Sequence, residues 1–198
     1  MPSVTPAEAD ARVREHLPEI QWIKDRELAE AVLRIWSRAW RTSVWADLRT
    51  VPKSPDLPER RTLITHTRAV TQIAERMVDV ETALHGVSID LDRTLAIALL
   101  HDVCKLHEFA PDPSGDSPSG ARFSRTGRLY QHGYLGAQWM AEEGLDEELI
   151  HGVLAHTPLS SVVPQTQEAV VVHYADFVDS DVQLLDAGLR LFCKRRQP

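Results

Sequence analysis

Histidine and aspartate side chains are the residues of this sequence whose types and spacing could do chemistry. Nine histidines occur in 198 residues. Four of them, with two aspartates, fall at or inside different stretches of helical character: His66, His101, Asp102, His132, His156 and Asp176. Imidazole and carboxylate groups together suit iron, manganese, zinc and related ions, without selecting one of them. If five helices direct these side chains to one point, as helical bundles with metal sites do, they form a metal centre.

The adjacent pair His101 and Asp102 is the strongest part of this pattern, because it follows the apolar residues 95–100 directly. A carboxylate at the end of a buried helix costs several kcal/mol unless it is paired or bound to a metal. Side chains one residue apart diverge by roughly 100° on a helix. We therefore expect the pair near a helix end or between two metals.

Each of the other residues also has an ordinary structural interpretation when it is taken alone. His66 could be a hydrogen-bonded core histidine, and His132 could simply begin a helix. His156 could end a helix, where the macrodipole favours a cation. Asp176 could be a helix cap or part of a buried salt bridge. The whole set together favours metal binding.

Helical periodicity surrounds these residues and must position them. Apolar residues recur at three- and four-residue steps, which predicts helices over 6–17, 20–48, 62–84, 91–106, 131–143, 146–155 and 165–179. The proline-rich stretch 51–58 predicts a linker. The glycine- and proline-rich stretch 110–128 predicts a long surface loop. Hairpin patterns are essentially absent, although residues 170–172 would permit a short strand. We expect an all-α fold.

Composition limits the functions that fit. With 198 residues and 43% apolar residues, the chain can fill one core, and its formal charge of -7 argues against a broad surface for extended nucleic acid. No apolar run is long enough for a membrane span, and no signal-peptide pattern opens the sequence. We expect a soluble cytoplasmic protein with no membrane partner. Two cysteines do not make a disulfide framework.

The order of the histidines and aspartates resembles that of the HD superfamily of metal-dependent phosphohydrolases. The likeness covers about residues 62–182, and 99–105 is close to the superfamily's signature of apolar residues followed by HD-x-x-K. The segments 132–137 and 156–157, with the closing 173–176, are similar to the two-metal subset and nearest the bacterial symmetrical diadenosine-tetraphosphate hydrolases. The resemblance implies an HD-domain helical bundle over 61–185. An N-terminal helical extension and proline-rich linker would occupy 1–60, and a tail would occupy 186–198.

The resemblance also implies a ligand set and a reaction. One metal would be held by His66, His101, Asp102 and Asp176, and a second by His132 and His156, with Asp102 bridging. The ions would be divalent, two per chain, and iron, manganese or similar. Two such ions can hold a bridging hydroxide that attacks a phosphoryl group. The implied activity is hydrolysis of a phosphate ester or anhydride in a nucleotide or other small phosphorylated molecule.

Basic residues near these ligands are candidates for binding the phosphate. Lys105 lies four residues after His101, one helical turn away, where it could neutralise charge on the phosphoryl group, although a solvated lysine is the alternative. Arg125 and Arg128, in the predicted loop, could clamp the substrate. His151 could assist from outside the metal ligands.

A second class of function uses the same ligands. HD-fold oxygenases that act on myo-inositol and on aminophosphonates resemble this ligand set and activate dioxygen at a di-iron centre. Residue spacing does not separate the two classes, whereas oxygen consumption would. A non-catalytic HD-like module would be expected to lack some of the ligands. We rank the hydrolase first.

Overall fold

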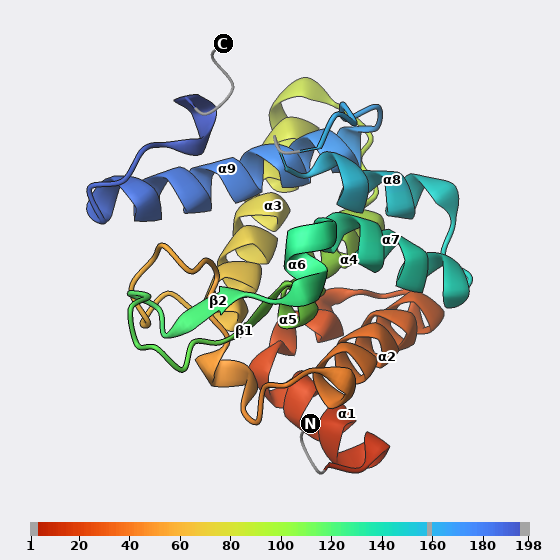
Figure 1. Ribbon diagram of the computed structural model, residues 1–198. Coiled ribbons are helices and arrows are strands. Elements are labelled where there is room, and N and C mark those ends of the chain that lie inside the picture. The colour runs from red at the N-terminus through yellow and green to blue at the C-terminus, as the bar shows by residue number, and fades with distance from the viewer. Residues whose placement is uncertain (1–3, 158–159, 195–198) are drawn as a thin grey trace.

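The computed structural model describes residues 4–157 and 160–194, and its fold is built from helices (Figure 1). The α-helices are α1 (Pro6–His16), α2 (Arg26–Thr42), α3 (Leu63–His85), α4 (Leu91–Leu100), α5 (Lys105–Glu108), α6 (Arg125–Leu129), α7 (His132–Glu142), α8 (Glu147–Ala155) and α9 (Gln167–Asp186). Short 3-10 turns are η1 (Pro18–Trp22), η2 (Leu48–Thr50) and η3 (Phe192–Lys194). The predicted all-α class is confirmed.

Helix α4 lies at the centre of the molecule. Asp90 caps its first turn by accepting a hydrogen bond from the backbone N–H of Arg93. Residues 95–100 are buried all round the helix, because α2, α3, α8 and α9 pack against it. This is the position expected for a helix without a polar face. The end of α4 is therefore fixed on several sides.

The N-terminal residues pack into the same core as the rest of the chain. Trp36 and Trp40 of α2 are buried, and the indole Nε1 of Trp36 donates to the carbonyl of Leu99 at 2.8 Å. In the stretch predicted to be a linker, Val51, Lys53 and Leu57 are buried, and Pro52 forms a β-bridge with Thr62. One hydrophobic core therefore spans the predicted boundary at residue 60.

The region 110–128 differs from the expected loop. Strands β1 (Phe109–Pro111) and β2 (Ala121–Phe123) pair antiparallel, with Phe109 opposite Phe123, and α6 follows. The expectation of a plain loop was wrong because strands of three residues are too short to show an alternating pattern. Residues 170–172, where a strand was considered, lie inside α9 instead.

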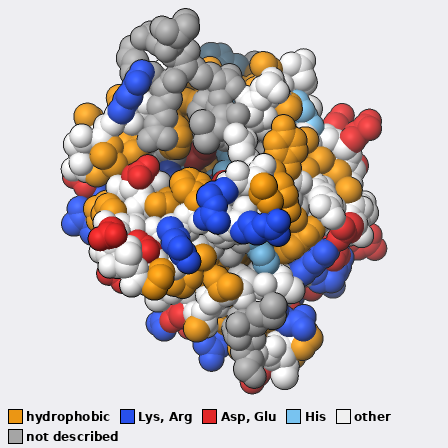
Figure 2. All heavy atoms as spheres, in the orientation of Figure 1, with side chains coloured by type: hydrophobic (Ala, Val, Ile, Leu, Met, Phe, Trp, Pro, Cys, Tyr) orange, Lys and Arg blue, Asp and Glu red, His pale blue; other side chains and the backbone are white. Residues whose placement is uncertain are grey.

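The surface of this region carries positive charge. Figure 2 shows Lys and Arg side chains gathered over β2 and α6, on a chain whose overall charge is negative. Among the described residues, no helix combines the length and the apolar character needed to cross a membrane. Within the predicted tail, η3 is held to α9, because the backbone N–H of Phe192 donates to Asp181 at 2.5 Å; residues 195–198 lie outside the described part.

Candidate metal centre

The helices bring all six predicted ligands to one buried place. His66 lies on α3, His132 begins α7 and Asp176 lies on α9, while His156 follows α8 directly. Each of the six side chains belongs to a residue that is at most 7% exposed: His66, His101, Asp102, His132, His156 and Asp176. The ligands come from segments up to 110 residues apart in sequence, so only the packed bundle assembles them.

The adjacent pair His101 and Asp102 reaches the centre because α4 ends just before it. Helix α4 stops at Leu100, His101 is its C-cap, and α5 begins at Lys105. The turn that follows has backbone hydrogen bonds from Val103 to Leu100 and from Lys105 to Asp102. The pair thus lies at a helix end, as expected, and the predicted helix over 91–106 is interrupted there.

The carboxylate of Asp102 lies between two pairs of histidines. Its Oδ2 is 3.2 Å from Nε2 of His66 and 3.4 Å from Nε2 of His101. Its Oδ1 is 3.0 Å from Nε2 of His132 and 3.5 Å from Nε2 of His156. Asp176 adds Oδ1 at 3.2 Å from Nε2 of His66. Five of the six groups thus form two clusters that share Asp102, and Asp176 adjoins the first of them at His66.

Two of the histidines are oriented by carbonyl groups at helix ends. Nδ1 of His101 donates to the carbonyl of Ala98 at 2.7 Å, and Nδ1 of His156 donates to the carbonyl of Val153 at 2.5 Å. These bonds place the proton on Nδ1 and leave the lone pair of Nε2 facing Asp102.

The other two histidines are oriented by carboxylates. Nδ1 of His66 donates to Asp179 at 2.5 Å, and Nδ1 of His132 donates to Glu108 at 2.9 Å. Such a carboxylate fixes the ring and makes Nε2 a better ligand. Neither carboxylate was among the predicted site residues. The three-residue step from Asp176 to Asp179 on α9 was a signal for one, whereas Glu108 lies on a four-residue helix without a periodic pattern.

The facing ring nitrogens show that the site suits cations. Nε2 of His66 lies 3.1 Å from Nε2 of His101, and Nε2 of His132 lies 3.2 Å from Nε2 of His156. Two lone pairs repel at this distance unless a proton or a metal ion lies between them. Asp102 Oδ2 is also buried and receives no well-directed hydrogen bond from a described group. These donors fit divalent metal ions.

The neighbouring carboxylates affect the protonation of the histidine pairs in the metal-free protein. Burial lowers the pKa of His66, but the neighbouring aspartates outweigh it and raise that pKa to about 9. Burial likewise opposes protonation of His132, whose pKa Glu108 and Asp102 nevertheless raise to about 9. Burial lowers the pKa of His156. Protonation of His66 and His132 therefore relieves the repulsion between facing ring nitrogens, and a bound cation would replace these protons.

Lys105 lies at the same carboxylate. Its Nζ is 2.7 Å from Oδ2 of Asp102, and its side chain is 12% exposed. Burial opposes its charge, but Asp102, Glu108 and Asp176 outweigh that effect and raise the pKa of Lys105. It lines a cavity of about 120 Å³ over the cluster, together with Lys53 and with the rings of Phe109 and Phe123. The ammonium is thus positively charged and faces the cavity.

Three predicted substrate-binding residues lie outside this cavity. Arg125 is exposed and lines a different surface hollow beside Thr42. Arg128 is exposed and donates to the carbonyl of Phe123 at 2.8 Å. His151 accepts a hydrogen bond from the backbone N–H of Gln165 at 2.9 Å. The proposed site leaves these side chains out, and their role in binding stays a prediction.

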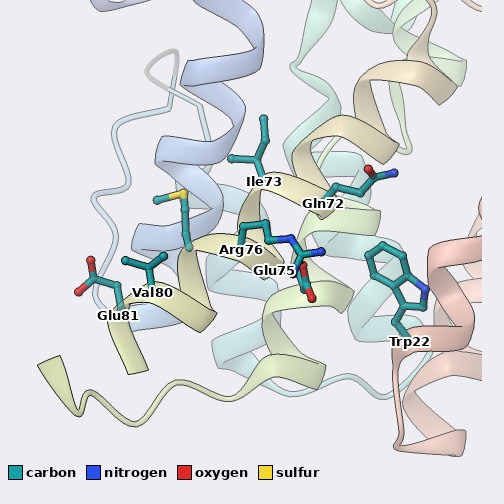
Figure 3. Close-up of a pocket in the computed structure, with 8 residues that line it drawn as sticks. Trp22, Gln72, Ile73, Glu75, Arg76, Val80 and Glu81 are labelled. Atoms are coloured by element: carbon teal, nitrogen blue, oxygen red, sulfur yellow. The ribbon is translucent and has the colours of Figure 1, made fainter. Parts of the chain in front are cut away.

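A larger hollow lies elsewhere, on the outer face of α3. It has a volume of about 500 Å³, and Figure 3 shows Trp22 at one end and Val80 and Glu81 at the other. Arg76 pairs with Glu75 there at 3.3 Å. Histidine is absent from the described residues that line it, so it offers no comparable donor set. Two of the clustered histidines and both aspartates line the smaller cavity instead.

Comparison with known proteins agrees with this assignment. A family model described as the HD domain matches residues 63–181. The chain is 33% identical over 135 residues to a dihydroneopterin 2′,3′-cyclic phosphate phosphodiesterase of Methanocaldococcus jannaschii; the match covers 68% of this chain and 51% of that protein. This chain therefore spans about half the length of that relative. No solved structure was found to match. The predicted resemblance to diadenosine-tetraphosphate hydrolases is not confirmed at the level of the subset, but the chain belongs to the HD domain family.

Proposed function

We propose that this protein is a metal-dependent hydrolase of a phosphate ester in a small molecule. The observation that carries the proposal is the position of Asp102, whose two oxygens each face a pair of histidine Nε2 atoms while Lys105 lies 2.7 Å from one of them. A shared carboxylate between two donor clusters suits two ions close together, and a neighbouring ammonium suits an anionic substrate. The membership in the HD family and the phosphodiesterase relative support the same class.

We propose two divalent ions, with iron or manganese as the first choices. His66, His101 and Asp102, with Asp176 beside His66, would hold one, and Asp102, His132 and His156 the other. When bound, such ions polarise a phosphoryl oxygen and lower the pKa of a water molecule. Among the described residues, four carboxylates of low exposure surround the site and two lysines oppose them: Asp102, Glu108, Asp176, Asp179, Lys53 and Lys105. Two divalent ions reverse this negative balance, so the loaded site attracts an anion.

The chain's own groups then have separate tasks. Asp102 stays ionised, since Lys105, His101 and His132 outweigh the effect of burial and hold its pKa well below the usual range. Glu108 and Asp179 hold the rings of His132 and His66. Lys105 is placed to contact a phosphoryl oxygen and to stabilise the charge that develops on it.

The cavity suggests what carries the phosphate. It has a volume of about 120 Å³, and Lys53, Lys105 and proposed ligand side chains line it together with phenylalanine rings. We propose that the phosphoryl group lies against the lysines and the ligands, and that the organic part lies against the rings. Phe109 and Phe123 form an edge-to-face pair there, with ring centroids 5.3 Å apart, and Phe123 is 46% exposed. An exposed ring suits a planar heterocycle, so we propose the phosphate ester of a small heterocyclic compound, cyclic phosphates included.

The decisive experiment combines metal analysis with a substrate panel. Protein purified with and without oxygen would be analysed for metal, stripped with a chelator and reloaded with Mn²⁺ or Fe²⁺. Anaerobic assays would then use 2′,3′-cyclic phosphates of a nucleoside and of a pterin, a phosphomonoester and diadenosine tetraphosphate. We expect metal-dependent hydrolysis of an ester that Asp102→Ala and His132→Ala abolish. Failure of the loaded protein to hydrolyse any ester would refute the proposal, and substrate-dependent oxygen consumption would favour the oxygenase.

A further inference from the structure

Lys53 is a buried lysine in a segment that precedes the matched family region. It is 2% exposed, and its backbone N–H donates to the carbonyl of Arg61 at 2.9 Å. The bridge between Pro52 and Thr62 ties the same segment to the start of α3. Nothing in the sequence of the proline-rich stretch indicated this position. The segment therefore carries an ammonium group into the interior at a fixed place.

The side chain of Lys53 is joined to the metal centre by hydrogen bonds. Its Nζ donates to Oγ of Ser180, and that hydroxyl donates to Oδ1 of Asp176 at 2.9 Å. Asp176 Oδ1 in turn lies 3.2 Å from Nε2 of His66. Lys53 thus lies one hydroxyl group away from a proposed metal ligand, and it lines the same cavity as Lys105.

The ammonium has bonding capacity that the described protein groups do not use. An ammonium has three N–H donors, and the one hydrogen bond described for Nζ goes to Ser180. A buried ammonium is costly unless it is well paired. The ring of Phe192 lies 5.8 Å from Nζ and gives only a weak additional contact. The remaining donors are available to a ligand in the cavity.

We propose that Lys53 binds the phosphoryl group of the substrate, so that Lys53 and Lys105 hold its oxygens from two sides of the cavity. This inference rests on the proposed function. The two lysines come from different parts of the chain. Lys105 lies within the matched family region, residues 63–181, whereas Lys53 precedes it. The phosphate-binding site is therefore complete only with the N-terminal segment.

A competing explanation is that Lys53 only balances the charge of Asp176 and Asp179. Burial lowers the pKa of Lys53 to about 8, against the opposing effect of those carboxylates, which leaves it mainly protonated at neutral pH. A purely structural counter-ion would affect metal content and stability. A phosphate-binding residue would affect phosphate affinity at unchanged metal content.

The test measures the affinity of the metal-loaded protein for inorganic phosphate by calorimetry, beside metal content and thermal stability. Lys53→Met should weaken phosphate binding roughly tenfold to a hundredfold, the loss expected for a charge-assisted hydrogen bond, while metal content stays at the wild-type level. Lys24→Met, at an exposed lysine, is the matched control and should change nothing. If Lys53→Met does not fold, Lys53→Gln carries the test with the same expectation.

Two outcomes would overturn the inference. One is wild-type phosphate affinity in the Lys53 variant, and the other is a loss of phosphate binding that only follows a loss of metal. Neither affects the proposed function, which fails separately if the loaded wild-type protein hydrolyses no phosphate ester. Wild-type protein that hydrolyses an ester while Lys53→Met keeps its phosphate affinity would refute the role of Lys53 alone.

Discussion

The two carboxylates outside the metal ligands should control the two ions separately. Glu108 accepts a hydrogen bond from His132, in one half of the site, at 2.9 Å, and Asp179 accepts one from His66, in the other half, at 2.5 Å. Loss of such a partner typically costs about 10- to 100-fold in metal affinity. We therefore predict that Glu108→Ala weakens one binding step and Asp179→Ala weakens the other.

The structure also predicts which variants lose more metal affinity. Glutamine keeps an oxygen that accepts the Nδ1 hydrogen of His132 but removes the charge, so Glu108→Gln should cost about tenfold in affinity, or about 1.4 kcal/mol. Alanine removes both the acceptor and the charge from a group that is 8% exposed. Glu108→Ala should approach a hundredfold, or about 2.8 kcal/mol. Asp179→Asn and Asp179→Ala should repeat this order in the other half.

Stepwise titration of metal-free protein with Co²⁺, followed by visible absorption and by competition with a chelating dye, resolves the two binding steps. Glu143→Gln, at a carboxylate that pairs with Arg34 far from the site, is the matched control. Equal weakening of both steps by Glu108→Ala would refute the assignment of separate halves. Unchanged affinity in all four variants would refute the role of the outer carboxylates.

Two further predictions concern stability and are checked by urea denaturation. A methyl group at Gly152 of α8 would lie 2.5 to 2.9 Å from side-chain atoms of Ile97, so Gly152→Ala should lower the free energy of unfolding by about 1–2 kcal/mol. A methyl group at Gly136 of α7 would meet its nearest neighbour at an ordinary 3.5 Å. Gly136→Ala should therefore raise the free energy of unfolding by about 0.5–1 kcal/mol. A change of the same sign in both would contradict this reasoning. Asp146 caps α8 and pairs with Arg93, which lowers the pKa of Asp146 to about 2. This folded pKa lies below the unfolded value of about 4, so the ionised carboxylate stabilises the folded state. Asp146→Ala should lower the free energy of unfolding by about 1 kcal/mol at pH 7, and the difference in stability from wild type should shrink as pH falls from about 4 towards 2. A difference in stability that does not change with pH would exclude the charged pair as its source.

The sequence indicated the histidine–aspartate pair and the central helix because both have local signals. An aspartate next to a histidine at the end of an apolar run is unusual by itself, and the run from Leu95 to Leu100 predicts a buried helix. Helix periodicity gave the main helices for the same reason. These features depend on neighbouring residues, which a single sequence contains.

The residues that were missed act only through the tertiary structure. Glu108 and Lys53 have no pattern around them that indicates a role, and each becomes part of the site because a distant segment packs against it. Arg125 and Arg128 were proposed from residue type in a glycine-rich loop, and both are exposed on α6, so their role in substrate binding stays a prediction. Charge and residue type alone therefore did not identify these site residues, because their positions in the folded chain were also needed.

The end of α4 shows how the metal centre depends on residues outside the matched family region. The last four carbonyl groups of a helix have no partner within it and need others when they are buried. His101 satisfies two of them, through its backbone N–H to Ile97 and its Nδ1 to Ala98. The backbone N–H of Val103 donates to the carbonyl of Leu100, and the indole Nε1 of Trp36, on α2, donates to the carbonyl of Leu99.

One partner of this helix end is thus a proposed metal ligand, and another is a tryptophan from the N-terminal segment. The backbone that orients His101 is consequently held by α2, just as Lys53 is supplied by the following proline-rich stretch. Residues 4–62 therefore contribute both to the hydrogen bonding beside the proposed ligands and to the wall of the cavity. We expect the proposed activity to require the segment that precedes the HD region as well as that region.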